Sequence, residues 1–97
     1  MKAIIIKSFK SDDTCVEIKH HDYKVALTEL CQLMDYVGSN HYGLKIYCID
    51  SNACKFYIDG TDIADATSKM LLEEYGAECI HSHTEENGRV CIAEFEW

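Results

Sequence analysis

Hydrophobic and polar residues alternate along three pairs of neighbouring segments, and this pattern predicts three β-hairpins. Alternate side chains of a strand point to the same face of a sheet, so opposed hydrophobic pairs mark the face that packs on the core. In the first two hairpins we expect these opposed pairs on the core face: Ile4 with Ile18, Ile6 with Val16, Ile46 with Ile58 and Cys48 with Phe56. The same registers leave Ile5 and Tyr47 on the other, outer face of the sheet.

The third hairpin is predicted at the end of the chain, where Asn87 and Gly88 separate strands 78–85 and 90–97. Asparagine and glycine tolerate the positive φ angles of a type I′ turn, so this pair strongly favours a tight hairpin. With the turn centred there, we expect these opposed pairs on one face: Cys79 with Glu96, His81 with Glu94, His83 with Ile92 and Glu85 with Val90.

Two further segments repeat hydrophobic residues with the period of an α-helix. We expect Asp22 to cap the first helix and Gly38 to end it, and the second helix to be capped by Asp59 or Thr61 and to stop at Gly76. The expected buried stripes are Tyr23, Ala26, Leu30, Leu33 and Val37 in the first helix, and Ile63, Ala66, Met70 and Leu71 in the second.

The elements therefore follow the order ββα-ββα-ββ, which predicts a single α+β domain over residues 1–97. Its parts are two ββα units at residues 1–38 and 44–76, whose sequences repeat weakly, and a C-terminal hairpin at residues 78–97. We expect a mostly antiparallel sheet of about six strands with both helices packed on one face. The pattern does not determine the order of the strands.

The composition narrows the possible partners. The 97 residues carry a net charge of −8, which argues against direct binding to nucleic acid or to an anionic membrane, since both attract positive charge. The six cysteines contain no Cys-x-x-Cys pair, and we interpret them as reduced residues of a cytoplasmic protein. No hydrophobic stretch approaches the length of about 20 residues that crosses a bilayer, and no cofactor is expected.

The acidic charge is confined to one part of the chain. Residues 1–58 contain as many basic as acidic residues, whereas residues 59–97 contain ten acidic residues against Lys69 and Arg89. Such a surface either keeps a small protein soluble or complements a basic site on a partner protein. For the second case we expect contacts from Asp62, Asp65, Glu73, Glu74, Glu78, Glu85 and Glu86.

Our leading hypothesis is a small, non-enzymatic binding protein or inhibitor that docks on the basic, nucleic-acid-binding surface of a partner protein. Its carboxylates would take the place of phosphates, as in a nucleic-acid mimic. In size and charge the chain is similar to the small acidic proteins that block nucleic-acid enzymes, a class that includes phage-encoded inhibitors of CRISPR systems (anti-CRISPR proteins). The similarity is one of class and involves no residue motif.

A second hypothesis is a homodimeric ligand-binding or regulatory module joined through the outer sheet face. The expected contacts are Ile5, Phe9, Tyr47, Ile49 and Tyr57. In the expected register Tyr47 lies directly opposite Tyr57, between lysines. Such a pair stabilises a half-exposed sheet, belongs to a protein interface or stacks on nucleic-acid bases, and the net charge disfavours the last of these.

His81, His83 and Glu94 form the nearest approach to a metal or acid–base site. A metal site needs a further ligand and an open position, and catalysis needs a pocket, so we interpret this cluster as a solvated strand face. The sequence contains no Gly-x-Ser-x-Gly, no His-Glu-x-x-His and no glycine-rich phosphate loop. We therefore expect neither a bound metal nor an enzymatic activity, and a metal-dependent activity on His81, His83 and Glu94 is the third and least favoured hypothesis.

Overall fold

The computed structural model describes residues 1–38, 45–48 and 53–97. Along the chain its elements are β1 (Lys2–Ser8), β2 (Asp13–Lys19), α1 (Tyr23–Gly38), β3 (Lys45–Cys48), β4 (Ala53–Asp59), α2 (Asp62–Glu73), β5 (Glu78–Glu85), the short 3-10 turn η1 (Glu86–Gly88) and β6 (Val90–Glu96).

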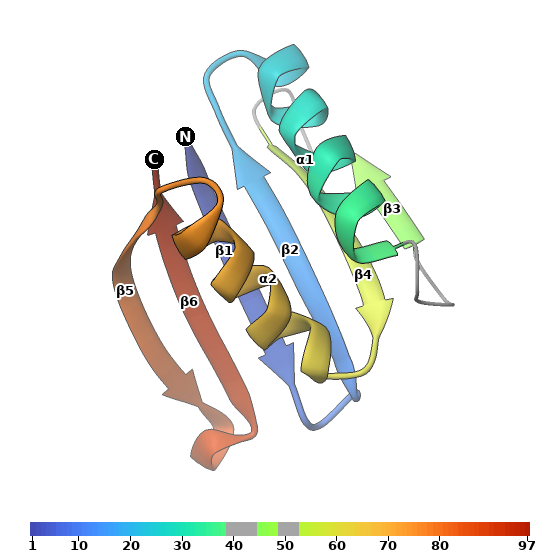
Figure 1. The fold of residues 1–97 in the computed structure, drawn as a ribbon. Helices are drawn as coiled ribbons and strands as arrows, with labels where there is room; N and C mark the ends of the chain where they lie inside the picture. The colour runs from blue at the N-terminus through green and yellow to red at the C-terminus, as the bar shows by residue number, and fades with distance from the viewer. Residues whose placement is uncertain (39–44, 49–52) are drawn as a thin grey trace.

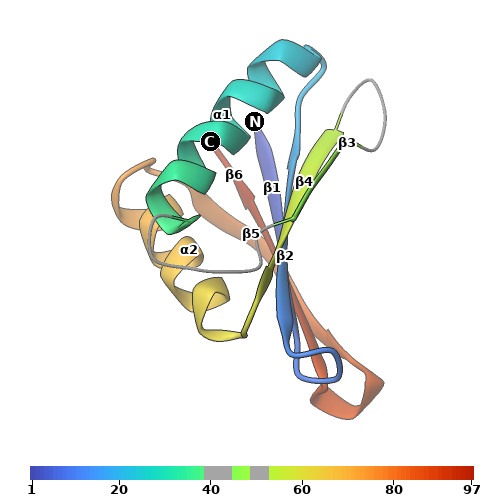
Figure 2. The same cartoon turned by 90° about the vertical axis from the view of Figure 1, so that its right-hand side faces the viewer.

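The strands form one sheet in the order β3-β4-β2-β1-β6-β5, and every neighbouring pair is antiparallel. Both helices lie on the same face of this sheet, as the two views in Figure 1 and Figure 2 show. Helix α1 packs over β2 and β4, while α2 packs over β1 and β2. The prediction of an α+β fold, with two helices and an antiparallel sheet, is confirmed.

The hydrophobic core lies between the helices and the central strands. Strand β2 contributes three alternate side chains that are fully buried, Thr14, Val16 and Ile18. The helices cover them with residues that are also buried: Ala26, Leu30 and Leu33 from α1, and Ile63, Ala64, Met70 and Leu71 from α2. Buried alternation on a strand beneath the apolar stripe of a helix is the usual arrangement of a two-layer fold.

The predicted register of the first hairpin is wrong by one residue. The structure pairs Ile18 with Ala3 and Val16 with Ile5, and it buries Ala3 and Ile5. Strand parity is exact, so this shift moves Ile4 and Ile6 to the outer face. The cause is a turn of four residues, 9–12, which contains Asp12 in the left-handed region at φ 52°.

Serine hydroxyl groups hold that turn. The hydroxyl of Ser11 lies 2.7 Å from the Asp13 carboxylate and 2.9 Å from the Ser8 hydroxyl, and the Ser11 backbone N–H donates to Ser8 Oγ. Short polar side chains that bond to nearby backbone groups favour turns over strands. They set the length of this turn, and the length of the turn sets the register.

In the second hairpin the prediction is wrong by two positions along the partner strand. Ile46 pairs with Phe56, Cys48 with Cys54, and Tyr47 with Lys55, so Tyr47 does not lie directly opposite Tyr57. A two-residue shift preserves the alternation of faces, and a hydrophobic pattern therefore cannot distinguish the two registers.

The third hairpin follows the predicted register from His81 to Glu85 and departs from it at a bulge. The register shifts between Cys79 and His81, so Cys79 pairs with Phe95 instead of Glu96. In the turn, Asn87 and Gly88 have φ angles of 59° and 82°. The N–H of Arg89 donates to the carbonyl of Glu86 at 3.2 Å, as expected for the predicted type I′ turn.

The helix caps agree in part with the predictions. The N–H of Lys24 donates to the Asp22 carboxylate at 3.0 Å, which confirms Asp22 as the cap of α1. Thr61 occupies the N-cap position of α2, but its side chain makes no capping hydrogen bond. Gly76, at φ 66°, follows the end of α2 and turns the chain towards β5.

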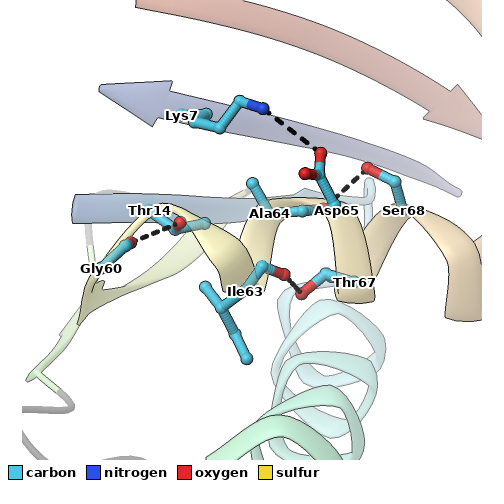
Figure 3. A network of polar contacts seen from close by, with 8 residues as sticks. All are labelled: Lys7, Thr14, Gly60, Ile63, Ala64, Asp65, Thr67 and Ser68. Atoms are coloured by element: carbon cyan, nitrogen blue, oxygen red, sulfur yellow. Dashed lines mark hydrogen bonds and ion pairs between the residues drawn. The ribbon is translucent and has the colours of Figure 1, made fainter. Parts of the chain in front are cut away.

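The predicted stripe of α2 contains one error, because Ala66 is exposed while Ala64 and Thr67 are buried. The Thr67 hydroxyl donates to the Ile63 carbonyl at 2.7 Å, so this polar residue is hidden at little cost (Figure 3). Thr14 is satisfied in the same way by the Gly60 carbonyl at 2.9 Å.

Leu71 and Leu72 are a matched pair for testing this packing. Leu71 is completely buried, whereas its neighbour Leu72 is 47% exposed. We expect Leu71→Ala to lower the free energy of unfolding by about 2–5 kcal/mol, because it leaves a cavity in the core. Leu72→Ala should change it by less than about 0.5 kcal/mol. Urea denaturation followed by circular dichroism measures both values, and equal losses would contradict the orientation of α2.

Candidate functional site

The predicted acidic contacts lie on α2, on β5 and in the turns at their ends (Figure 1). All of these side chains are exposed: Asp62, Asp65, Glu73, Glu74, Glu78, Glu85 and Glu86. We call this set the acidic surface. Its members follow one another closely along the chain, but they occupy two faces of the sheet. Helix α2 lies over β1 and β2, whereas the strand pairings put Glu78 and Glu85 on the face opposite the helices.

Two members of the acidic surface form ion pairs with lysines of the same chain. Asp65 on α2 reaches Lys7 on β1 at 3.3 Å, as Figure 3 shows, and Glu86 bonds to Lys10 at 2.9 Å. The Asp65 side chain is 79% exposed. Exposed pairs of this kind contribute at most about 1 kcal/mol, so a cation on another molecule can replace either lysine.

Other members occupy positions where a negative charge is locally unfavourable. Glu73 ends α2 and Glu74 is its C-cap residue, and the last turn contains no basic residue. The C-terminal end of a helix carries partial negative charge and favours cations. Glu78 on β5 pairs directly with Glu96 on β6, and like charges in directly opposed positions destabilise a sheet.

Glu96 was missed by the sequence analysis. The predicted register placed Cys79 opposite it, and only the bulge in β5 brings Glu78 to that position. On its other side Glu96 pairs with Lys2 of β1. Lys2 and Glu96 are neighbours because β1 lies beside β6, and the hydrophobic pattern does not determine this strand order.

A cleft of about 440 Å³ opens between α2 and the strands β1, β5 and β6. Among its lining residues are three with hydroxyl groups, Ser68, Ser82 and Thr84, together with the ion-paired Lys7 and Asp65. It exists because the helices cover β1, β2 and β4, while β5 and β6 extend beyond α2. The cleft lies beside Asp65 of the acidic surface, and its lining combines these polar groups with apolar side chains such as Ile5 and Ile92.

The histidines of β5 bond to one another and to a carboxylate on the same strand. His81 Nε2 lies 2.9 Å from His83 Nδ1, and His83 Nε2 lies 3.1 Å from Glu85 Oε1. The tautomer that satisfies both bonds has His83 donating its Nε2 proton to Glu85 and accepting one from His81. The predicted pairing of His81 with Glu94 across the strands is confirmed.

These histidines do not form a metal centre with Glu94. Within residues 1–38, 45–48 and 53–97 there is no group of three His, Cys, Asp or Glu side chains that could hold a metal ion. Their hydrogen bonds run along the exposed strand, where alternate residues share one face. The cluster therefore presents a chain of imidazole groups ending on a carboxylate at the edge of the acidic surface.

The residues predicted for self-association have different positions. Ile5 was wrongly assigned to the outer face, since it is only 2% exposed and lies in the core. Phe9 is 55% exposed, and the Lys7 ammonium group lies 5.3 Å from its ring centre. Tyr57 is half-buried. Ile49 and the side chain of Tyr47 lie outside the described part of the structure.

Tyr75 follows α2 and takes part in packing. Its ring meets the Trp97 ring edge-on, with 5.6 Å between the centroids. Burial, and secondarily the negative charge of Glu29, raise the pKa of the Tyr75 phenol. The phenol therefore stays neutral at physiological pH, and its ring packs against the core beside Trp97.

Comparisons with known proteins leave the family open. No protein-family model and no curated protein matches the sequence. No helix in the described part of the chain is long and apolar enough to span a membrane.

The opposed carboxylates of Glu78 and Glu96 provide a test of the local electrostatics. We expect Glu78→Gln to raise the free energy of unfolding by about 0.2–1 kcal/mol, because it removes a repulsion across the strands. In a double-mutant cycle with Glu96→Gln, the second change should add less than it does alone, since either one removes the same repulsion. Urea denaturation at low salt measures the cycle, and additive effects would show that the two charges do not interact.

Proposed function

We propose that this protein is a small, non-enzymatic binding protein whose acidic surface docks on a basic, nucleic-acid-binding surface of a partner protein and blocks it. The observation that carries the proposal is the placement of Glu73, Glu74 and Glu78. These carboxylates occupy a helix C-terminus and a like-charged strand pair, where negative charge opposes stability. Residues that oppose local stability are most often retained for a function.

The amount and position of the charge support the same conclusion. The excess of acidic residues is confined to residues 59–97, which form α2 and the C-terminal hairpin of β5 and β6. A localised negative field attracts a basic surface, orients the encounter and raises the association rate. A charge that served only solubility would be equally effective if it were distributed over the whole surface.

A basic surface that normally binds nucleic acid is the partner chemistry that fits best. Such surfaces present lysine and arginine side chains that pair with phosphates, and arginine binds carboxylates with the same bidentate geometry. The net charge of −8 disfavours nucleic acid itself as the ligand. Small acidic inhibitors of nucleic-acid enzymes, including anti-CRISPR proteins, share this size and charge, and we propose that the chain acts in that manner.

The test is affinity capture from cells of the source organism, with and without phage infection. We expect Glu73→Lys combined with Glu74→Lys to weaken capture of the partner at least about tenfold, because both carboxylates become repulsive to a basic surface. Glu29→Lys combined with Asp35→Lys makes the same change in net charge on α1 and should have little effect. A DNA oligonucleotide should compete for the captured partner.

Reversal of four charges, at Asp62, Glu73, Glu74 and Glu78, should abolish capture at low salt. If this variant remains folded by circular dichroism and captures the partner as well as the wild type does, the acidic surface is not the docking site.

A further inference from the structure

The cleft between α2 and the strands β1, β5 and β6 already holds a cation of the chain itself. The Lys7 ammonium group lies 3.3 Å from Oδ1 of Asp65, as Figure 3 shows, and both residues line the cleft. The same ammonium group lies 5.3 Å from the centre of the Phe9 ring. A carboxylate and an aromatic face both attract cations, so this part of the cleft is suited to a positive group.

Lys7 makes only a weak bond in this position. A hydrogen bond between an ammonium group and a carboxylate is usually about 2.7–2.9 Å long, whereas the contact between Lys7 and Asp65 measures 3.3 Å. Among the residues that the structure describes, only one oxygen of Asp65 is bonded in this way. The Asp65 side chain is 79% exposed and that of Lys7 is 22% exposed. The carboxylate is therefore free to turn towards a cation that enters from solvent.

Three hydroxyl groups of the cleft offer further hydrogen-bond acceptors. The Ser68 hydroxyl donates its proton to the Ala64 carbonyl at 2.9 Å, so its oxygen remains able to accept. The hydroxyl groups of Ser82 and Thr84 also line the cleft, and they make no hydrogen bond within the described part of the chain. Ala64 and Ala93 add apolar surface. A matching ligand carries positive charge, donates several hydrogen bonds and has an apolar stem.

We propose that this cleft binds the guanidinium group of an arginine side chain of the partner protein, which replaces Lys7 on the Asp65 carboxylate. Guanidinium has five N–H donors in a planar fork and binds a carboxylate through two parallel bonds. By displacing the ammonium group it also gains the Phe9 ring, which is 55% exposed and offers a face for stacking. The cleft volume of about 440 Å³ is within the range of ligand sites, about 300–1,000 Å³.

An anion bound to Lys7 is the opposite arrangement, and the surrounding charge disfavours it. Lys7 is the only lysine or arginine among the described residues that line the cleft. Asp62 and Asp65 both lie in the first turn of α2. The net charge of −8 is concentrated in residues 59–97, which form α2, β5 and β6 around the cleft. This field attracts a cation to the cleft and repels an anion.

This inference rests on the proposed function, because the arginine belongs to the basic surface of the partner, but the two are tested separately. The capture experiments alter other carboxylates of the acidic surface and leave Asp65 and Lys7 unchanged. The test of the cleft uses the purified protein and a small probe, without the partner. If the probe binds and charge reversal does not affect capture, the docking proposal is wrong and the arginine site stands. If charge reversal abolishes capture and the probe does not bind, only the arginine site is wrong.

The probe is N-acetyl-arginine amide, titrated into isotope-labelled protein and followed by two-dimensional NMR. We expect saturable shifts of the backbone signals of Ser68, Ser82 and Thr84, with a dissociation constant of about 1–10 mM. The lysine analogue, N-acetyl-lysine amide, should bind at least about threefold more weakly, because an ammonium group cannot make the paired bonds of guanidinium.

Two substitutions in the cleft should have opposite effects. Lys7→Met removes the competing cation and should tighten binding of the arginine probe at least about threefold, whereas Asp65→Asn should weaken it at least about tenfold. Lys10→Met breaks an ion pair outside the cleft, and Asp35→Asn removes a carboxylate from α1. These two controls make the same changes in net charge and should leave binding of the probe unchanged.

The NMR spectrum also shows whether each variant is folded, and Asp65→Asn, at an exposed position, tests the site even if Lys7→Met does not fold. Equal binding by the wild type and Asp65→Asn would overturn the proposal, as would a folded Lys7→Met that binds no more tightly than Lys10→Met. Inorganic phosphate is the final comparison. If phosphate shifts the same signals and Lys7→Met abolishes those shifts, the cleft is an anion site and the proposal is wrong.

Discussion

The fold depends on the burial of alternate residues of β2 beneath both helices. Val16 and Ile18 are completely shielded from solvent, and β2 packs against α1 and against α2. A two-layer domain of this size has room for one continuous core, so the strand under both helices determines where each of them lies. The consequence is an asymmetric coverage of the sheet. The helices cover its centre and one side, while the C-terminal hairpin extends beyond them with its charged residues in solvent.

The features predicted most accurately are those that depend on a few neighbouring residues, such as a helix cap or a tight turn. Asp22 caps α1 because a carboxylate beside a free backbone N–H is recognisable from sequence, and Asn87-Gly88 forms its turn because few other pairs accept two positive φ angles. The first strand failed for an equally physical reason. Residues 3–6 are all hydrophobic, so either set of alternate residues could face the core. The length of the serine-rich turn determines which set does so.

The candidate site could be predicted only as a set of exposed carboxylates. The helical period and the strand alternation placed Asp62 and Glu85 in solvent, and the structure agrees. The Glu78–Glu96 pair and the recess between α2 and β6 depend on a bulge and on the strand order. Both are long-range properties, because β6 pairs with β1 from the opposite end of the chain, and no local pattern encodes that choice.

The bulge in β5 also bears on how this protein avoids aggregation. An edge strand of eight residues offers unpaired backbone groups to any extended chain, which makes it a template for fibre growth. Here the strand is irregular at Ile80 and carries carboxylates at both ends, Glu78 and Glu85. The backbone hydrogen-bonding groups of β5 are irregularly spaced at Ile80, so an incoming strand could not pair with all of them. The carboxylates would also repel it unless it carried positive charge. The edge is thereby closed to copies of itself and to most unfolded chains, and lateral growth of the sheet stops at β5.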